Sequence, residues 1–154
     1  MYTKEQTARQ KQAFWTAFGK YMQPIPSAEG TPISWINYKT GIPGIQFKMD
    51  ADHKTATIAI VLNHKDTALQ SLQFDKLTQL KPIFLETLEG EAWDWKKHQI
   101  IEGGKTISTI SKTLPGVNIH RQEDWPAIIS FLKQRIIMLD AFWSLVKEGF
   151  PSAT

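Results

Sequence analysis

The sequence contains no cysteine. Without a thiol the chain cannot form a disulfide bond, hold zinc or an iron–sulfur cluster through thiolates, or use a cysteine nucleophile. It also has no apolar run approaching the roughly 18 consecutive residues that a membrane-spanning helix needs. The polar N-terminal segment MYTKEQTARQKQ lacks the apolar core of a signal peptide. From these absences we expect a cytoplasmic protein.

The bulk composition is that of an ordinary globular protein. The chain has 154 residues, of which 42% are hydrophobic and 21% are charged, and its formal net charge is +3. This length fits a single domain over residues 1–154 with a sizeable apolar core. The mild positive charge permits contact with nucleic acid, but it does not by itself indicate such contact.

The N-terminal half is expected to contain one helix followed by extended segments. Thr3 and Gln6 have the spacing of a capping box, and apolar residues then recur at helical intervals, which predicts a helix from Lys4 to Met22. A segment rich in proline and glycine follows. Strands are predicted over residues 33–38, 45–50 and 55–62.

The last two of these strands show a clear alternation of apolar and polar side chains. Phe47 and Met49 share a face with Ile45, whereas Gln46, Lys48 and Asp50 lie on the opposite face. Ile58, Ile60 and Leu62 alternate in the same way in the next strand. Alternation with a period of two residues is typical of an antiparallel sheet that is packed on one side.

The C-terminal half predicts a long helix, a hairpin and a second long helix. Residues 67–88 have helical periodicity, and Pro82 should kink that helix or divide it. Residues 93–101 and 106–114 have the pattern of a hairpin joined at EGGK. The predicted fold class is α+β, with a mainly antiparallel sheet of about five strands flanked by helices, in the order α-β-β-β-α-β-β-α.

The last predicted helix is unusually apolar. It begins after Asp124, an N-cap residue, and runs to about residue 148. Its apolar stripe is wider than the ~100° that an ordinary surface helix presents. Either the helix lies at the centre of the fold, or it buries a second face in a homodimer or against another partner. The residues that would form such an interface are Phe131, Met138, Phe142 and Leu145.

Asp50, Asp52 and His53 lie together between two predicted strands. Such side chains can bind a metal ion, so a weak metal site is one interpretation. The order of elements resembles that of the PD-(D/E)XK nucleases, and a divergent nuclease would use Lys48 with the two aspartates. However, the strand TATIAIVL supplies neither the acid nor the lysine of that family's third strand. We therefore favour the polar tip of a hairpin, and we expect no catalytic residue and no cofactor.

A different segment is the strongest candidate for nucleic-acid binding. Trp93 and Trp95 would lie on the same face of a strand, and Lys96 and Lys97 follow directly. Aromatic rings beside positive charge can bind single-stranded nucleic acid by stacking and ion pairing. The alternative, which we favour, is that both tryptophans face the core and that the lysines solvate an edge strand.

Five segments of the chain resemble a known family. They are FWTAFGKYM, SAEGTPISWINYKTG, FKMDADHKTATIAI, LPGVNI and DWPAIISFLKQRI, and they span nearly the full length. In these segments the sequence is similar to a bacterial family called domain of unknown function 4268. The resemblance implies a compact accessory module with a loose association to nucleic-acid enzymes. It brings no catalytic residue, because none is established for the family.

From the sequence we expect a non-enzymatic cytoplasmic module for binding or assembly, with homodimerisation as a further expectation. The first alternative is a nucleic-acid-binding accessory domain associated with nuclease or restriction systems, and the second is a divergent metal-dependent nuclease-like domain. These expectations share one premise. Polar side chains are expected to be dispersed around a well-filled apolar interior instead of gathered at a pocket.

Overall fold

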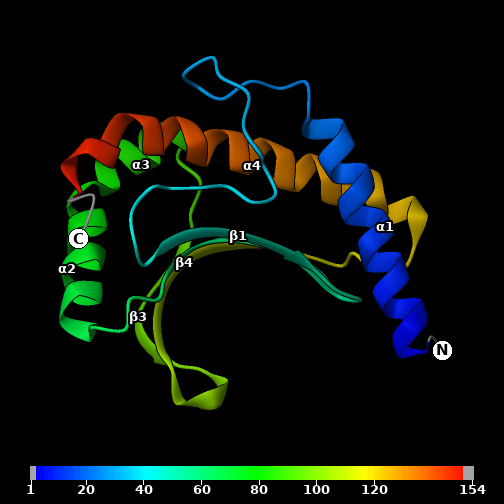
Figure 1. The fold of residues 1–154 in the computed structure, drawn as a ribbon, viewed down its shortest axis with the longest axis horizontal. Coiled ribbons are helices and arrows are strands. Elements are labelled where there is room, and N and C mark those ends of the chain that lie inside the picture. Colours follow the sequence, from blue (N-terminus) through cyan, green and yellow to red (C-terminus); the bar gives the residue numbers. More distant parts are fainter. Residues whose placement is uncertain (1–2, 151–154) are drawn as a thin grey trace.

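A computed structural model describes residues 3–150 of the chain (Figure 1). The helices are α1 (Lys4–Met22), α2 (Thr67–Gln79), α3 (Lys81–Thr87) and α4 (Trp125–Val146), with short 3-10 turns η1 (Glu102–Gly104), η2 (Gln122–Asp124) and η3 (Lys147–Gly149). The strands are β1 (Ile45–Ala51), β2 (Thr55–Leu62), β3 (Asp94–Ile100) and β4 (Thr106–Pro115). No helix within residues 3–150 combines the length and apolarity needed to span a bilayer.

The strands form one antiparallel sheet in the order β1-β2-β4-β3. The α+β class and the antiparallel sheet are therefore confirmed, but the sheet has four strands in the described part of the chain, and not about five. The predicted strand over residues 33–38 is wrong. The segment forms bends and turns and pairs with no strand of the described sheet, although Trp35 is buried and Tyr38 stacks on Phe47 of β1.

Several local predictions are confirmed at residue level. Thr3 and Gln6 form the capping box at the start of α1, with N–O distances of 3.0 and 2.9 Å. Pro82 lies in the first turn of α3, directly after the chain has broken helical continuity at Leu80. Proline lacks a backbone N–H and is tolerated in the first helical turn, so it divides the predicted helix in two.

The helix α4 crosses one face of the sheet and packs against the sheet, α1 and α3 (Figure 1). Phe142 packs edge-on against Phe84 of α3, and Trp143 packs edge-on against Phe47 of β1. Burial on several sides explains the wide apolar stripe. Asp124 precedes α4, but its side chain does not cap the helix; it accepts a hydrogen bond from the Asn118 backbone at 3.0 Å.

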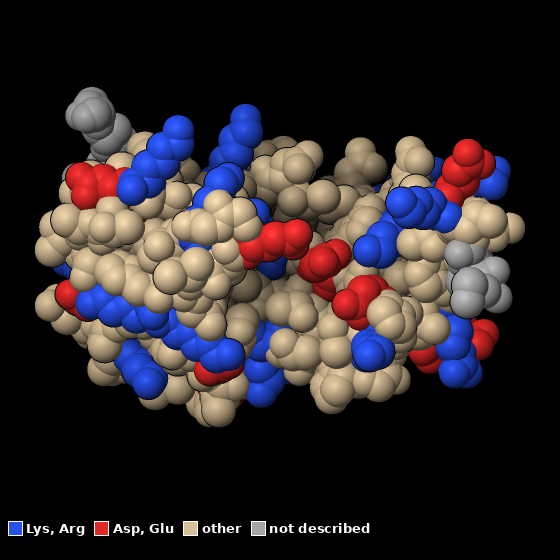
Figure 2. Space-filling model, turned by 90° about the horizontal axis from the view of Figure 1, so that it is seen from below, with Lys and Arg blue, Asp and Glu red and all other residues tan. Residues whose placement is uncertain are grey.

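The opposite face of the sheet carries none of the helices described within residues 3–150 (Figure 1). Strand register places Lys48, Ala59, Ser111 and Asp94 in one row across this face. A second row consists of Gln46, Val61, Thr109 and Lys96. Figure 2 shows this side of the molecule, where acidic and basic side chains are interspersed around a shallow hollow. Apart from Ala59 and Val61 of β2, which are buried, these rows are polar and mixed in charge, as is usual for an open sheet surface.

Candidate functional site

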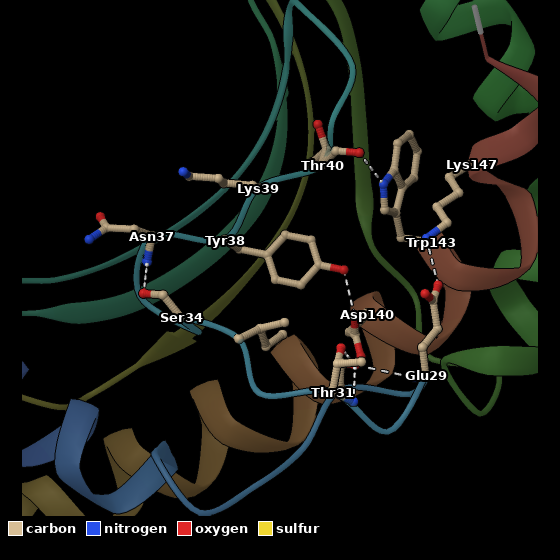
Figure 3. Close-up of a pocket in the computed structure, with 12 residues that line it drawn as sticks. Glu29, Thr31, Ser34, Asn37, Tyr38, Lys39, Thr40, Asp140, Trp143 and Lys147 are labelled. Atoms are coloured by element: carbon tan, nitrogen blue, oxygen red, sulfur yellow. Dashed lines mark hydrogen bonds and ion pairs between the residues drawn. The ribbon is translucent and has the colours of Figure 1, made fainter. Parts of the chain in front are cut away.

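The long connection between α1 and β1 forms a cavity of about 370 Å³ together with the C-terminal half of α4 (Figure 3). Most of its lining residues carry polar side chains. The lining residues are Ser27, Glu29, Thr31, Ile33, Ser34, Asn37, Tyr38, Lys39, Thr40, Asp140, Trp143 and Lys147. This grouping contradicts the expectation that polar side chains are dispersed, since several ionisable groups meet at one recess.

Two indole groups hold the connection in place. The Nε1–H of Trp35 donates to the carbonyl of Ile25 at 2.9 Å, and that of Trp143 donates to the carbonyl of Thr40 at 2.8 Å. The Thr40 hydroxyl in turn donates to the carbonyl of Ile45 at 2.7 Å. Buried backbone carbonyls outside regular structure need such partners. The segment is therefore an ordered wall even though it is not a strand.

Asp140 is the central polar group of the cavity. It projects from α4 and is only 5% exposed. Its Oδ1 accepts a hydrogen bond from the Tyr38 hydroxyl at 2.5 Å, and its Oδ2 accepts one from the Ala28 backbone N–H at 2.7 Å. These two bonds join the connection to α4 over more than a hundred residues of sequence separation.

The environment of Tyr38 keeps its hydroxyl protonated. Burial raises the pKa of Tyr38 far above its usual range, and the hydrogen bond to Asp140 raises it further. Desolvation disfavours the phenolate, and a neighbouring negative charge does the same. Tyr38 therefore acts as a hydrogen-bond donor and not as a base.

An ion pair lies at the rim of the cavity. The Glu29 carboxylate accepts hydrogen bonds from the Lys147 ammonium at 2.6 Å and from the Ser144 hydroxyl at 3.0 Å. These bonds hold the pKa of Glu29 below its usual range, with the Lys147 contribution the largest. Both side chains of the pair are substantially exposed, so the pair is solvated and can open.

No cation is paired with Asp140 within residues 3–150. The cavity has two lysines in its lining. Lys147 is bound to Glu29, and Lys39 is directed away from the Tyr38–Asp140 pair (Figure 3). Both hydrogen bonds described for the buried carboxylate thus come from neutral donors.

The sequence profile of the family described as domain of unknown function (DUF4268) matches residues 10–147. The chain belongs to the DUF4268 family. The matched region contains every residue that lines the cavity. Comparison with curated proteins and with solved structures finds no match for the chain.

In this DUF4268 domain, Asp50 lies near the end of β1, and Asp52 and His53 lie in the β1–β2 turn. One Asp52 oxygen accepts hydrogen bonds from the backbone N–H groups of Lys54 and Thr55, both at 2.8 Å. These bonds lower the pKa of Asp52. Asp50 accepts a bond from the Ala51 backbone. No group of three metal-ligating side chains occurs in the part of the chain that the structure describes.

The tryptophans of the predicted nucleic-acid surface point into the DUF4268 core. Trp93 is 8% exposed and packs edge-on against Phe84, and Trp95 packs edge-on against Phe74 and Phe84. Lys96 and Lys97 are exposed and pair with Asp94 and Asp75. Stacking of bases on these two rings would require them to leave the core.

The four residues predicted for an interface have different positions. Phe131 and Phe142 are buried within this DUF4268 chain, and Met138 is partly buried. Leu145, at 68% exposed, is the member of the set that faces solvent. An interface through α4 would therefore rely on Leu145 and its exposed neighbours.

Sequence reasoning missed Tyr38 and Asp140. Asp140 is the one acidic residue in the 22 residues of α4. A carboxylate is rarely buried without a partner or a role. The single acidic residue of this apolar helix could therefore have been singled out from the sequence. Tyr38 could not, because the segment around it has the alternation of a strand.

Proposed function

We propose that this chain is a non-enzymatic cytoplasmic binding module whose binding site is the cavity between the α1–β1 connection and α4. The observation that supports the proposal is the half-open recess of about 370 Å³, lined mainly by residues with polar side chains, around a buried carboxylate. Ligand sites usually have volumes of about 300–1,000 Å³ and a few convergent polar groups. The cavity has both properties.

The arrangement favours binding over catalysis. A general base must hold a free lone pair near its working pH. Tyr38 cannot be that base, because its raised pKa keeps it protonated, and Asp140 accepts hydrogen bonds from Tyr38 and Ala28 that fix its position. Such groups can orient a ligand without exchanging protons with it.

The test is a fragment screen observed by NMR on uniformly ¹⁵N-labelled protein. The indole N–H of Trp143 borders the cavity and reports on it, whereas the indole N–H of Trp125, bonded to Ile119 at 2.6 Å, is an internal control. We expect polar fragments to shift the Trp143 resonance. Fragments that shift only residues elsewhere, or none that bind, would refute the proposal.

A blocking variant makes the screen specific. Thr31 is exposed at the cavity, so Thr31→Trp should fill the recess and abolish fragment binding. The matched control is Thr113→Trp on the uncovered face of the sheet, because Thr113 is exposed and lies on the other side of the sheet from α4. Equal binding to both variants would place the site elsewhere.

Homodimerisation remains a second proposal. The exposed leucines Leu69, Leu72 and Leu145 on α2 and α4 support it, since exposed apolar side chains often mark interfaces. Sedimentation at several concentrations tests it. A dimer should dissociate on dilution and be weakened by Leu145→Lys, whereas a constant monomer mass would end the proposal.

Nucleic-acid binding is the proposed alternative. Exposed lysines on the uncovered side of the sheet, Lys48 and Lys96, support it, although Asp94 partly neutralises Lys96. Binding should weaken steeply with salt. The nuclease-like alternative requires in addition a magnesium-dependent cleavage that is lost on changing Asp50 and Asp52 together.

A further inference from the structure

We infer that the cavity accepts a positively charged group, a primary ammonium or a guanidinium, which pairs with Asp140. This inference rests on the proposed function, because it names the class of ligand for the same recess. The observation behind it is a buried carboxylate beside an open volume, with no cationic partner within residues 3–150.

The charge state of the recess supports a cationic ligand. Charged side chains are rarely buried in proteins unless they are paired, because their desolvation is costly. Asp140 is buried, and its partners are the neutral Tyr38 hydroxyl and the Ala28 N–H. A ligand cation would supply the missing opposite charge.

The hydrogen-bonding capacity of Asp140 is also incomplete. An ionised carboxylate offers about four lone-pair sites. Tyr38 and Ala28 use one site on each oxygen. An ammonium or guanidinium could donate to the remaining sites, and such charge-assisted bonds are stronger than neutral ones.

The other charged groups do not provide this compensation. Lys147 is engaged by Glu29 at 2.6 Å, and Lys39 is directed away from Asp140 (Figure 3). The hydroxyls of Thr31 and Ser34 line the wall and can accept further N–H groups. An anionic ligand would instead meet the carboxylates of Asp140 and Glu29.

The volume indicates that the cation belongs to a larger group. A cavity of about 370 Å³ holds more than an isolated ammonium ion. Ile33 in the lining offers an apolar contact for a short alkyl chain attached to the cation. Both a free alkylamine and a lysine or arginine side chain of a protein partner have this chemistry.

The competing explanation is that Asp140 has only a structural role, which is to hold the α1–β1 connection against α4 through hydrogen bonds. This role needs hydrogen bonds and no charge. In an asparagine, the side-chain oxygen can still accept from the Ala28 N–H, and the NH₂ group can donate to the Tyr38 hydroxyl oxygen, so both contacts can be kept. Cation binding requires the negative charge itself. The variant Asp140→Asn therefore separates the two explanations.

The experiment is an NMR titration with four probes of similar size: n-butylammonium, n-butylguanidinium, neutral n-butanol and anionic butyrate. We expect the two cations to shift the Trp143 indole resonance and to bind at least about tenfold more tightly than n-butanol or butyrate. Trp125 should not respond. Equal affinity for n-butanol, or no response to either cation, would overturn the inference.

Variants identify the partner of the cation. Asp140→Asn should weaken binding of n-butylguanidinium by about tenfold or more, while Asp75→Asn, an exposed carboxylate that pairs with Lys97, should leave it unchanged. Unchanged binding to Asp140→Asn would overturn the inference. If that variant does not fold, Lys147→Met provides a second test. It frees the Glu29 carboxylate and should raise the affinity for cations by about threefold, and a fall or no change would count against the inference.

A last comparison distinguishes the source of the cation. N-acetyl-lysine methylamide and N-acetyl-arginine methylamide carry the same groups with a peptide backbone. Tighter binding of these compounds than of the butyl probes supports a protein side chain, and the reverse order supports a free amine. If neutral fragments bind at the cavity without any preference for cations, the proposed function stands and this inference fails. If nothing binds there, both fail.

Discussion

At the scale of single residues, Asp140 has the largest consequence for the structure. It is one side chain on α4, yet it provides acceptors for a tyrosine hydroxyl and for a backbone N–H of the α1–β1 connection. The connection has no strand or helix of its own between Gln23 and Pro43. Its position therefore depends on individual hydrogen bonds of this kind.

Removing the carboxylate should destabilise the domain. Asp140→Ala leaves the Tyr38 hydroxyl and the Ala28 N–H without acceptors in a buried region, and we expect a loss of about 3 kcal/mol in the free energy of unfolding. Tyr38→Phe should cost about 1–2 kcal/mol. Urea denaturation measures both, and the double variant should show coupling. A loss no larger than that of the surface variant Asp94→Ala would contradict this account.

Asp52 should make the stability of the β1–β2 turn dependent on pH. Hydrogen bonds from Lys54 and Thr55 lower its pKa in the folded state. Its contribution to stability is therefore complete above the unfolded pKa and is lost as the pH falls through the lower, folded value. The stability difference between the wild-type protein and Asp52→Ala should shrink over this acidic range. The titration of the Asp52 carboxyl group is followed by ¹³C NMR. A stability difference that stays constant while this group titrates would be inconsistent with this role.

At the scale of elements, α2 is joined to the sheet by a buried polar network. Gln70 donates to the Thr106 carbonyl at 2.9 Å and accepts from the Ser108 hydroxyl at 2.8 Å. Ser108 also accepts a bond from the His98 backbone at 2.9 Å, at the bulge where β3 slips in register against β4. The network thus fixes the irregular part of the hairpin.

Breaking this network should be costly. Gln70→Leu leaves the Thr106 carbonyl and the Ser108 hydroxyl without their buried partner, with an expected loss of about 1–3 kcal/mol in the free energy of unfolding. The control is Thr113→Ala, because Thr113 lies on β4 with Thr106 and Ser108 but is exposed. It should change the free energy of unfolding by less than about 0.5 kcal/mol. Thermal and chemical denaturation compare the two. Similar losses would mean that the network is not stabilising.

The elements also show how far the sequence could predict the fold. The capping box at Thr3, the strand alternation from Ile45 onwards and the break near Pro82 are local signals, and the structure confirms them. The strand predicted around Trp35 was wrong because a loop with buried aromatic side chains can have the same alternation of apolar and polar residues as a strand. The contact between Tyr38 and Asp140 could not be predicted, since it depends on how the connection folds over α4.

At the scale of the whole molecule, the two sides of the sheet differ in what covers them. One side carries α4, the connection and the cavity, and the other is an uncovered polar face (Figures 1 and 2). The proposed binding site therefore lies away from the exposed lysines of that face. A ligand in the cavity and a partner on the uncovered face could bind independently.

This separation predicts that changes on the uncovered face leave the cavity unaffected. Lys48→Ala combined with Lys96→Ala should alter the free energy of unfolding by no more than about 1 kcal/mol, because both side chains are exposed. The affinity for n-butylguanidinium should remain that of the wild-type protein. Loss of this affinity in the double variant would show that cations bind on the sheet face instead.

A crystal structure of the protein grown with n-butylguanidinium would test the central claim most directly. We expect electron density for the guanidinium within hydrogen-bonding distance of the Asp140 carboxylate, with its butyl chain in the cavity. The account would be contradicted if the cavity contained only solvent while the guanidinium occupied exposed carboxylates such as Asp94 or Glu102.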